Sequence, residues 1–288
     1  MLAWMLIHFA LGAAGTWLAR RYALNRDLVD QPGERRSHAV STPRGGGIAI
    51  VVALLVACAA LAIRLPGQTW MLAAFGVGLV LVAGAGWLDD HRPTSPWVRL
   101  GVHALAAAVF AAAVQYVYAD PWLAGAAFVL AIGLVNVWNF MDGINGLAAT
   151  QAVLVSLALA AVMSGTWAGV ALALAAACLG FLPFNFPKAV VFLGDVGSGA
   201  MGFALAAITI MATATQSIAW PLLLLPLSAF LIDAGLTLLM RMWRGERWWT
   251  AHVQHSYQVW VRGGTTHAKA TFAYMAWTLL SVVLMLRL

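Results

Sequence analysis

Long apolar runs are the feature that most constrains this chain of 288 residues. About ten stretches are long enough to cross the hydrocarbon core of a bilayer as helices. They span 1–19, 46–64, 70–88, 100–118, 121–139, 146–163, 166–184, 198–214, 218–240 and 270–287. Only 9% of the residues are charged, whereas soluble proteins carry about 25%. The sequence therefore predicts a single all-α integral membrane domain over 1–288 and excludes a soluble globular enzyme.

The basic residues predict how the chain is oriented. Ten spans place both termini on one side of the membrane, and the connecting segments then alternate between the two sides. One set of segments, 20–45, 89–99, 140–145, 185–197 and 241–269, contains all but two of the 16 Lys and Arg residues. The positive-inside rule makes this set cytoplasmic, so both termini are expected in the periplasm of a bacterial inner membrane. The basic excess then reflects membrane orientation, and no nucleic-acid partner is expected.

The acidic residues gather on the same side, although carboxylates contribute little to orientation. All but Asp120 and Asp233 of the ten Asp and Glu residues lie in or beside the cytoplasmic segments. Asp233 falls inside a predicted span, where we expect it to support the site structurally. The gathering of carboxylates on one face therefore indicates a site at the membrane surface.

Asp89 and Asp90 form an adjacent acidic pair at the cytoplasmic end of the third predicted span. Neighbouring carboxylates repel each other unless a cation or a basic group is close. The pair is therefore typical of a metal or diphosphate site, or of a general base. The alternative is a solvated helix end neutralised by Arg92 and Arg99.

A second polar group follows the fifth predicted span. Asn136, Asn139, Asp142 and Asn145 recur every three residues, which predicts one polar stripe on a continuing helix. Two glycines within 136–146 would let a ligand approach the backbone closely. The alternative is a polar helix cap followed by a turn.

A third segment reads Phe192-Leu-Gly-Asp-Val-Gly-Ser198 and leads into a predicted span. Asp195 suits a hard cation, while Ser198 and the free amides of a helix start suit phosphate oxygens. An Asp or Ser helix cap within a glycine turn explains the same residues.

Two further segments combine basic and histidine residues. In the last cytoplasmic segment, Arg244 and Arg247 precede His252 and His255, whose spacing would place both rings on one helix face. This mixture suits a pyrophosphate or nucleotide, although a basic interfacial helix explains it too. In the first segment, Arg44 and His38 could meet an anionic substrate, or could simply belong to a positive cytoplasmic loop.

As an ordered set, these segments resemble the polyprenyl-phosphate N-acetylhexosamine-1-phosphate transferases, glycosyltransferase family 4. The resemblance rests on Leu88-Asp-Asp90, Asn136-x-x-Asn-Phe-Met-Asp-Gly-Ile-Asn-Gly-Leu147, Phe192-Leu-Gly-Asp-Val-Gly-Ser198 and Ala251-His-Val-Gln-His-Ser-Tyr-Gln258. It extends from about Asp30 to Tyr274. The family includes the phospho-N-acetylmuramoyl-pentapeptide translocases and the undecaprenyl-phosphate N-acetylglucosamine-1-phosphate transferases that begin O-antigen synthesis.

The resemblance implies a reaction and a set of roles. A UDP-N-acetylhexosamine would transfer its sugar 1-phosphate to undecaprenyl phosphate and release UMP, with Mg2+, or Mn2+ in its place, as cofactor. Asp195 matches the metal ligand, and Asp89 and Asp90 match the essential acidic pair. Asp142, with Asn139 and Asn185, matches polar residues around the nucleotide and metal. The resemblance also implies a homodimer.

Two departures from the family pattern matter. Asn145 stands where the family often has a second Asp, so it can hydrogen-bond to a uracil or sugar but supplies no charge. The last loop lacks the His-rich run of the pentapeptide translocases, which favours an O-antigen or related surface glycan over a peptidoglycan precursor.

Two mechanisms for the transfer and two rival functions remain open at this point. The lipid phosphate could attack directly, or the reaction could pass through an aspartyl-phosphate on Asp89 or Asp90. A lipid or glycan-precursor flippase would instead keep ionisable groups near the bilayer midplane. A lipid-binding scaffold would leave the Asp and Asn pattern unexplained.

Overall fold

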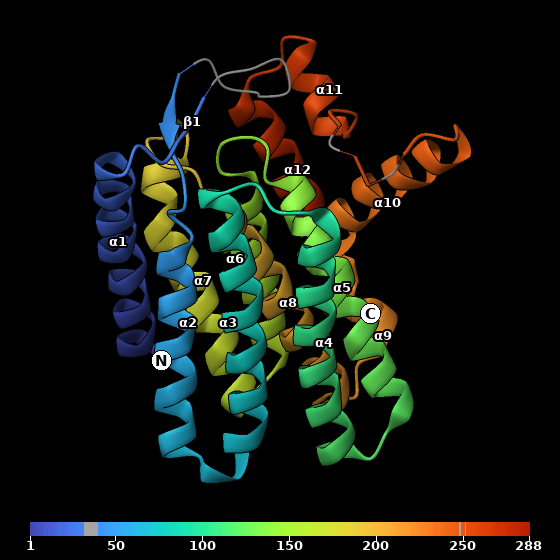
Figure 1. The fold of residues 1–288 in the computed structure, drawn as a ribbon. Helices are drawn as coiled ribbons and strands as arrows, with labels where there is room; N and C mark the ends of the chain where they lie inside the picture. Colours follow the sequence, from blue (N-terminus) through green and yellow to red (C-terminus); the bar gives the residue numbers. More distant parts are fainter. Residues whose placement is uncertain (32–39, 248, 251) are drawn as a thin grey trace.

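Helices make up nearly all of the regular structure in the computed structural model, which describes residues 1–31, 40–247, 249–250 and 252–288 (Figure 1). His38 therefore lies outside the described residues. The long helices are α1 (Leu2–Asn25), α3 (Thr69–His91), α4 (Pro96–Tyr118), α5 (Pro121–Met141), α7 (Gly165–Asn185), α8 (Asp195–Thr215) and α12 (His267–Arg287). The shorter elements are α2 (Ile48–Arg64), α6 (Leu147–Val162), α9 (Trp220–Leu223), α10 (Ser228–Trp243), α11 (Ser256–Arg262), the 3-10 turns η1 (Pro66–Gln68) and η2 (Leu225–Leu227), and the strands β1 (Val29–Asp30) and β2 (Thr42–Pro43).

The described helices confirm a multi-pass, all-helical membrane protein. Eight helical stretches are long and apolar enough to cross a bilayer, and α2 and α6 are shorter apolar helices of 17 and 16 residues. The predicted span over 218–240 corresponds to the helical stretch Trp220–Trp243, within which α9, η2 and α10 follow one another. Pro226 lies at the start of η2, and proline cannot donate the backbone hydrogen bond that a continuous helix needs.

Helix α8 occupies the centre of the bundle. Every residue from Val196 to Ala212 is buried, and α8 packs against α3, α5, α6 and α7. Small residues permit this close packing: a Cβ added at Gly202 would lie 2.2 Å from the carbonyl oxygen of Leu134 in α5. The position of α8 is therefore set by backbone-to-backbone contact with its neighbours.

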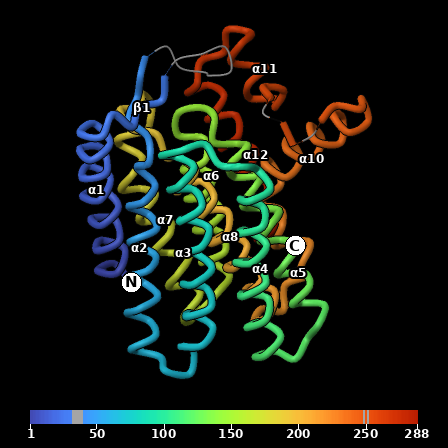
Figure 2. Tube along the Cα trace, viewed as in Figure 1, coloured from blue at the N-terminus to red at the C-terminus, as the bar shows by residue number. Residues whose placement is uncertain are grey.

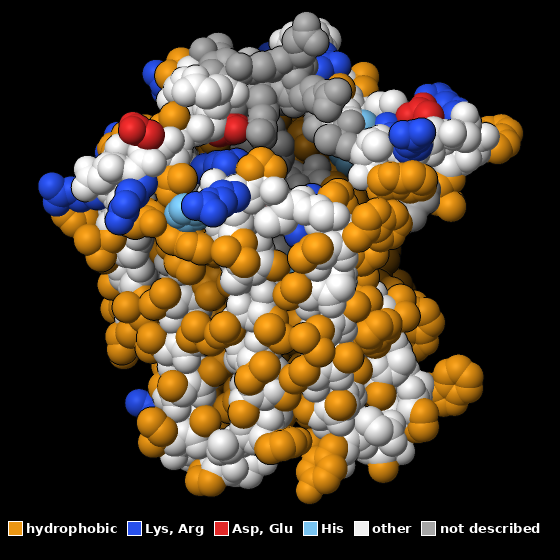
Figure 3. Space-filling model, viewed as in Figure 1, with side chains coloured by type: hydrophobic (Ala, Val, Ile, Leu, Met, Phe, Trp, Pro, Cys, Tyr) orange, Lys and Arg blue, Asp and Glu red, His pale blue; other side chains and the backbone are white. Residues whose placement is uncertain are grey.

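Charged side chains collect at one end of the molecule. In the space-filling view, hydrophobic side chains cover the sides of the bundle, whereas most of the visible Lys, Arg, Asp and Glu lie at the end that carries β1 and α11 (Figure 3). Both chain termini lie away from that end (Figure 2). The polar segments singled out in the sequence therefore lie at one end of the bundle.

The segment that precedes α2 is tied to the segment that precedes α8. The backbone N–H groups of Gly46 and Gly47 donate to the carbonyls of Phe192 and Leu193, at 2.9 and 2.8 Å. Gly45 has a φ of +90°, a conformation that L side chains rarely adopt. These bonds bring Arg44 to the N-terminal end of α8.

Gly202→Ala tests the close packing of α8. The added methyl group would clash with the carbonyl of Leu134, and overpacking of this kind costs about 1–3 kcal/mol. We expect a lower unfolding temperature for the detergent-solubilised variant. Gly133→Ala is the matched control, because nothing lies within 4 Å of its added Cβ and alanine favours a helix by about 1 kcal/mol. Equal unfolding temperatures for the two variants would contradict this packing.

Candidate active site

Asp90 caps the N-terminus of α8 from the neighbouring helix α3. Its two carboxylate oxygens accept hydrogen bonds from the backbone N–H groups of Asp195 and Val196, both at 3.1 Å. Gly194, the N-cap residue of α8, has no side chain that could satisfy these donors. The side chain of Asp90 is buried, and its backbone carbonyl accepts a hydrogen bond from Arg44 Nη2. Asp90 thus joins α3, α8 and the segment before α2.

Asp89 and Asp195 converge on a single cation. Arg99 Nη1 lies 3.0 Å from Asp89 Oδ2 and 2.8 Å from Asp195 Oδ2. The other oxygen of Asp89 accepts hydrogen bonds from the backbone N–H and the hydroxyl of Thr94, at 2.7 and 2.6 Å. Asp89, Asp90 and Asp195, three of the four aspartates expected in the site, therefore lie together at the junction of α3, α4 and α8.

Asn139 and Asp142 face the same cluster from the end of α5. Asn139 Nδ2 donates to Ser198 Oγ on α8 at 3.1 Å. Burial raises the pKa of Asp142 to about 8, and the negative charges of Asp195 and Asp90 add to the rise. A cation bound among these carboxylates would favour the charged form of Asp142.

The predicted stripe from Asn136 to Asn145 is wrong in its last turn. Helix α5 ends at Met141, so Asn145 lies in the turn beyond it. Asn145 donates through Nδ2 to the carbonyl of Pro187, and Asn136 donates to the carbonyl of Ile132 in its own helix. Within the described part of the chain, neither amide bonds to the carboxylate cluster.

Asn185 is used to hold two loops together. Its Oδ1 accepts from the backbone N–H of Gly146 at 2.8 Å, and its Nδ2 donates to the carbonyl of Val191 at 2.9 Å. The side chain is buried, and both ends of its amide are engaged by backbone groups. This arrangement makes Asn185 a support for the segments before α6 and α8, and its role near a nucleotide stays a prediction.

Asp233 holds the last polar segment against the bundle. Its Oδ1 accepts hydrogen bonds from the N–H and hydroxyl of Ser256 at 3.0 and 3.2 Å, and its Oδ2 accepts from the Tyr274 hydroxyl. His255 Nδ1 lies 3.6 Å from Asp233 Oδ1. The carboxylate therefore joins α10, the start of α11 and α12, as expected of a buried charge that is retained for support.

The two histidines do not share a helix face, because α11 begins at Ser256 with His255 as its N-cap. Their ring centroids nevertheless lie 4.8 Å apart. Burial, together with the nearby His255 and Arg241, lowers the pKa of His252 to about 4. His252 is therefore neutral at pH 7 and would contact phosphates by hydrogen bonding rather than by charge.

Arg244 and Arg247 are exposed at the end of α10, which leans away from the bundle (Figure 1). Arg241, which the sequence did not single out as a ligand, is buried and pairs with Glu246 at 2.9 Å. It also donates to the carbonyl of Arg247. Arg244 and Arg247 therefore stand apart from the carboxylate cluster in this conformation.

Tyr257 connects the last segment to the turn after α5. This fully buried side chain donates from its hydroxyl to the carbonyl of Phe140 at 2.9 Å. A Cβ added at Gly143 would lie 2.1 Å from the Tyr257 hydroxyl oxygen, so the glycine makes room for the ring. Two segments about 110 residues apart in the sequence thus form one side of the site.

A divalent cation fits the oxygen donors of this cluster. Within the described residues, no group of three or more His, Cys, Asp or Glu side chains is arranged to hold a metal by itself. Mg2+, however, is commonly bound by one or two carboxylates together with substrate phosphates. The oxygens of Asp89 and Asp195 already converge on one positive group, the Arg99 guanidinium. The donor set therefore suits a cation that substrate phosphates help to bind.

Sequence reasoning missed Thr94, and it named Tyr257 only as part of the last polar segment. Arg99 was considered only as a surface partner that would neutralise Asp89 and Asp90. Arg99 follows Asp89 by ten residues, and the turn from α3 to α4 lies between them. A turn this short brings the first residues of α4 back beside the end of α3, so the contact with Asp89 had a signal in the sequence. The contact of Arg99 with Asp195 depends on helix packing and had no signal in the sequence.

Together, the bundle and the carboxylate cluster define a polytopic membrane protein with a polar site at one end. Residues 69–213 match the model of glycosyl transferase family 4. The match covers the segments that carry Asp89, Asp90, Asp142 and Asp195. This chain belongs to glycosyl transferase family 4.

Curated relatives of the chain are named for related reactions. It is 32% identical over 240 residues to a decaprenyl-phosphate N-acetylglucosaminephosphotransferase of Mycobacterium leprae, covering 70% of this chain and 58% of the relative. It is 31% identical over 212 residues to a probable undecaprenyl-phosphate N-acetylglucosaminyl 1-phosphate transferase of Bacillus subtilis, covering 68% and 58%. A phospho-N-acetylmuramoyl-pentapeptide-transferase of Heliobacterium modesticaldum is 31% identical over 229 residues, covering 68% and 70%. The matched region thus spans little more than half the length of the first two relatives.

Asp90→Asn tests the cap on α8. An amide has one oxygen, so it can satisfy only one of the two N–H groups of Asp195 and Val196, and its NH2 group would face the other. Loss of a helix cap costs about 1 kcal/mol. We expect a lower unfolding temperature for the purified variant in detergent, measured without substrate. An unfolding temperature equal to that of the wild type would show that α8 does not need this cap.

Proposed function

We propose that this protein transfers an N-acetylhexosamine 1-phosphate from a UDP-sugar to undecaprenyl phosphate and releases UMP. The observation that carries the proposal is the convergence of Asp89 and Asp195 on one cation beside the capped N-terminus of α8. Phosphoryl transfer needs charge neutralisation and positioning more than covalent assistance from the protein. A carboxylate cluster that can share a divalent cation with substrate phosphates supplies these two requirements. The names of the relatives support the same reaction class.

Mg2+, with Mn2+ as a substitute, is the proposed cofactor. Asp195 would hold it, with Asp89 as the second carboxylate. When bound, the cation supplies charge neutralisation for the sugar diphosphate. Release of Arg99 from the two carboxylates would leave its guanidinium free to contact a phosphate. Asn139 and Ser198, already hydrogen-bonded to each other at the start of α8, would orient the nucleotide beside them.

Direct attack by the lipid phosphate is favoured over an aspartyl-phosphate intermediate. Both oxygens of Asp90 accept backbone N–H groups of α8. The oxygens of Asp89 are engaged by Thr94 and Arg99. A carboxylate nucleophile needs a free oxygen aimed at phosphorus. Asp90 presents none, and the oxygen of Asp89 that Arg99 releases would be taken by the proposed cation. The acidic pair is therefore assigned to positioning and charge balance.

The proposed setting is the inner membrane of a bacterium, with ten spans, both termini periplasmic and the site cytoplasmic. The Lys and Arg distribution and the charged end of the bundle support this orientation (Figure 3). A flippase is disfavoured, because the intramembrane Asp233 is committed to Ser256 and Tyr274. A passive scaffold would not need carboxylates that converge on one cation.

Asp195→Asn and metal removal together test the proposed reaction. We expect the purified wild type to release UMP from a UDP-N-acetylhexosamine only when polyprenyl phosphate and Mg2+ are both present, and EDTA to abolish the release. Asp195→Asn should reduce turnover by about 100-fold or more, since a lost charge contact to a transferring phosphate is worth several kcal/mol.

Asp120→Asn is the control for this substitution. Asp120 is exposed and caps α5 at the opposite end of the bundle, and asparagine serves equally well as an N-cap. Its turnover should match the wild type. Near-normal, metal-dependent UMP release by Asp195→Asn would overturn the metal assignment, and wild-type release without polyprenyl phosphate would overturn the proposed acceptor.

The donor is proposed to be an N-acetylhexosamine used for O-antigen or a related surface glycan. The last cytoplasmic segment reads His-Val-Gln-His-Ser-Tyr-Gln over 252–258, without a longer His-rich run. We expect UMP release from UDP-N-acetylglucosamine or a 6-deoxy derivative such as UDP-N-acetylfucosamine or UDP-N-acetylquinovosamine. UDP-N-acetylmuramoyl-pentapeptide should neither react nor compete in the same assay. Preferential turnover of the pentapeptide substrate would refute the surface-glycan assignment.

A further inference from the structure

The two carboxylates of the proposed metal site, Asp89 and Asp195, are carried by helices in direct backbone contact. A Cβ added at Gly86 in α3 would lie 2.4 Å from the carbonyl carbon of Asp195 in α8. Asp89 follows Gly86 by about one helical turn and so lies on the same face of α3. The backbones therefore bring the two side chains together, and the orientation of each carboxylate remains to be fixed.

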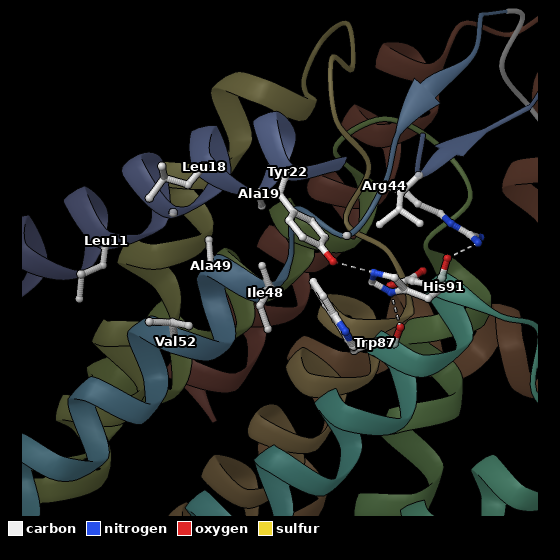
Figure 4. Close-up of a pocket in the computed structure, with 14 residues that line it drawn as sticks. Leu11, Leu18, Ala19, Tyr22, Arg44, Ile48, Ala49, Val52, Trp87 and His91 are labelled. Carbon is white, nitrogen blue, oxygen red and sulfur yellow. Dashed lines mark hydrogen bonds between the residues drawn. The ribbon is translucent and has the colours of Figure 1, made fainter. Parts of the chain in front are cut away.

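The end of α3 that carries Asp89 is also anchored on the side that faces α1 (Figure 4). His91 donates from Nδ1 to the carbonyl of Trp87 at 2.8 Å, and its Nε2 accepts from the Tyr22 hydroxyl at 3.3 Å. The rings of Tyr22 and Trp87 lie 5.5 Å apart. These contacts hold the last turn of α3 against α1, so the main freedom left to Asp89 is rotation of its side chain.

The two oxygens of the Asp89 carboxylate have different partners. Oδ1 accepts hydrogen bonds from the backbone N–H and the hydroxyl of Thr94, at 2.7 and 2.6 Å. Oδ2 lies 3.0 Å from Arg99 Nη1, the nitrogen that is also 2.8 Å from Asp195 Oδ2. The last torsion of an Asp side chain is broad and has no strongly preferred setting of its own. Two donors on Oδ1 fix this torsion, so that Oδ2 points toward the shared cation.

The turn from α3 to α4 presents Thr94 in a restricted conformation. Pro93 precedes Thr94, and Pro96 begins α4. A proline fixes its own φ and keeps the residue before it extended, as seen at Arg92 with a ψ of 122° and at Ser95 with a ψ of 133°. The backbone hydrogen bond from residue 94 would survive most substitutions, whereas the second hydrogen bond requires a hydroxyl there.

We propose that Thr94 is a positioning residue that orients the Asp89 carboxylate for the divalent cation. This inference rests on the proposed transferase function and adds how the second carboxylate of its metal site is preorganised. Carboxylates that bind metals are commonly hydrogen-bonded by neighbouring groups, and loss of such a partner costs about 10–100-fold in metal affinity or activity. Thr94 is that partner here, because it occupies one oxygen of Asp89 and leaves the other to the cation.

Three variants isolate the contribution of the hydroxyl group. Thr94→Val removes the hydroxyl but keeps the branched side chain and the backbone N–H. Thr94→Ser restores the hydroxyl and is the conservative rescue. Thr69→Val is the matched control, because Thr69 is exposed at the opposite end of α3 and its hydroxyl donates to the carbonyl of Ala62 at 3.3 Å.

The first experiment measures metal binding without turnover. Mn2+ is titrated into the purified full-length protein in detergent, without either substrate, and the free ion is followed by its EPR signal. We expect the Kd for Mn2+ to rise by about tenfold in Thr94→Val. Thr94→Ser and Thr69→Val should bind Mn2+ with the Kd of the wild type.

The second experiment measures UMP release as a function of Mg2+ concentration. Thr94→Val should need about tenfold more Mg2+ for half of its maximal rate, and saturating Mg2+ should recover most of the lost rate. The KM for the UDP-sugar at saturating Mg2+ should stay that of the wild type. A purely structural role for Thr94 would instead lower the unfolding temperature and the rate at every Mg2+ concentration, without a change in the metal constant.

An unchanged Mn2+ Kd in Thr94→Val, failure of Thr94→Ser to restore it, or no Mn2+ binding by the wild type would each refute the positioning role. These results are distinguishable from failure of the proposed function. If the Kd rises as expected but no variant or wild type releases UMP, Thr94 orients a metal ligand and the transferase assignment fails. If UMP is released and the Kd is unchanged, the transferase assignment stands and the positioning role fails.

Discussion

The hydrogen bonds between the Asp90 carboxylate and the first two amides of α8 are the interaction on which the site depends. Helix α8 is buried along nearly its whole length, so its N-terminal donors need partners from the protein. A glycine N-cap supplies none, and Asp90 on α3 supplies both. The backbone carbonyl of Asp90 also accepts from Arg44, and Asp195, whose amide Asp90 caps, pairs with Arg99. Removal of this cap would therefore loosen three parts of the site together.

The carboxylates near the membrane boundary are each bound by donors from the protein. Asp89 and Asp195 share Arg99, and Asp233 shares its oxygens among Ser256, Thr237 and Tyr274. In a low-dielectric environment an unpaired carboxylate is costly, so each is surrounded by donors. Asp233 thereby joins α10 to the start of α11 and to α12, and Tyr257 in α11 donates to the carbonyl of Phe140 near the end of α5.

Much of the fold and of the candidate site could be predicted, and the failures have identifiable causes. Apolar runs located the helices, because length and composition alone decide whether a segment can span a bilayer. The stripe ending at Asn145 failed because α5 stops at Met141, and periodicity cannot locate a helix end inside a polar segment. The pairing of Arg99 with Asp195 and the hydrogen bond from Gly146 to Asn185 were missed because each joins residues far apart in the sequence.

The sequence by itself determined that this is a helical membrane protein whose charged residues gather at one end, since hydropathy and the Lys and Arg distribution are local properties. It also located the four aspartates of the candidate site. Only the tertiary structure decided what each one does: Asp90 caps α8, Asp89 and Asp195 share a cation, and Asp142 is held where burial raises its pKa. The reason is physical, because hydrogen bonding and burial depend on the helices packed alongside, which residue spacing does not encode.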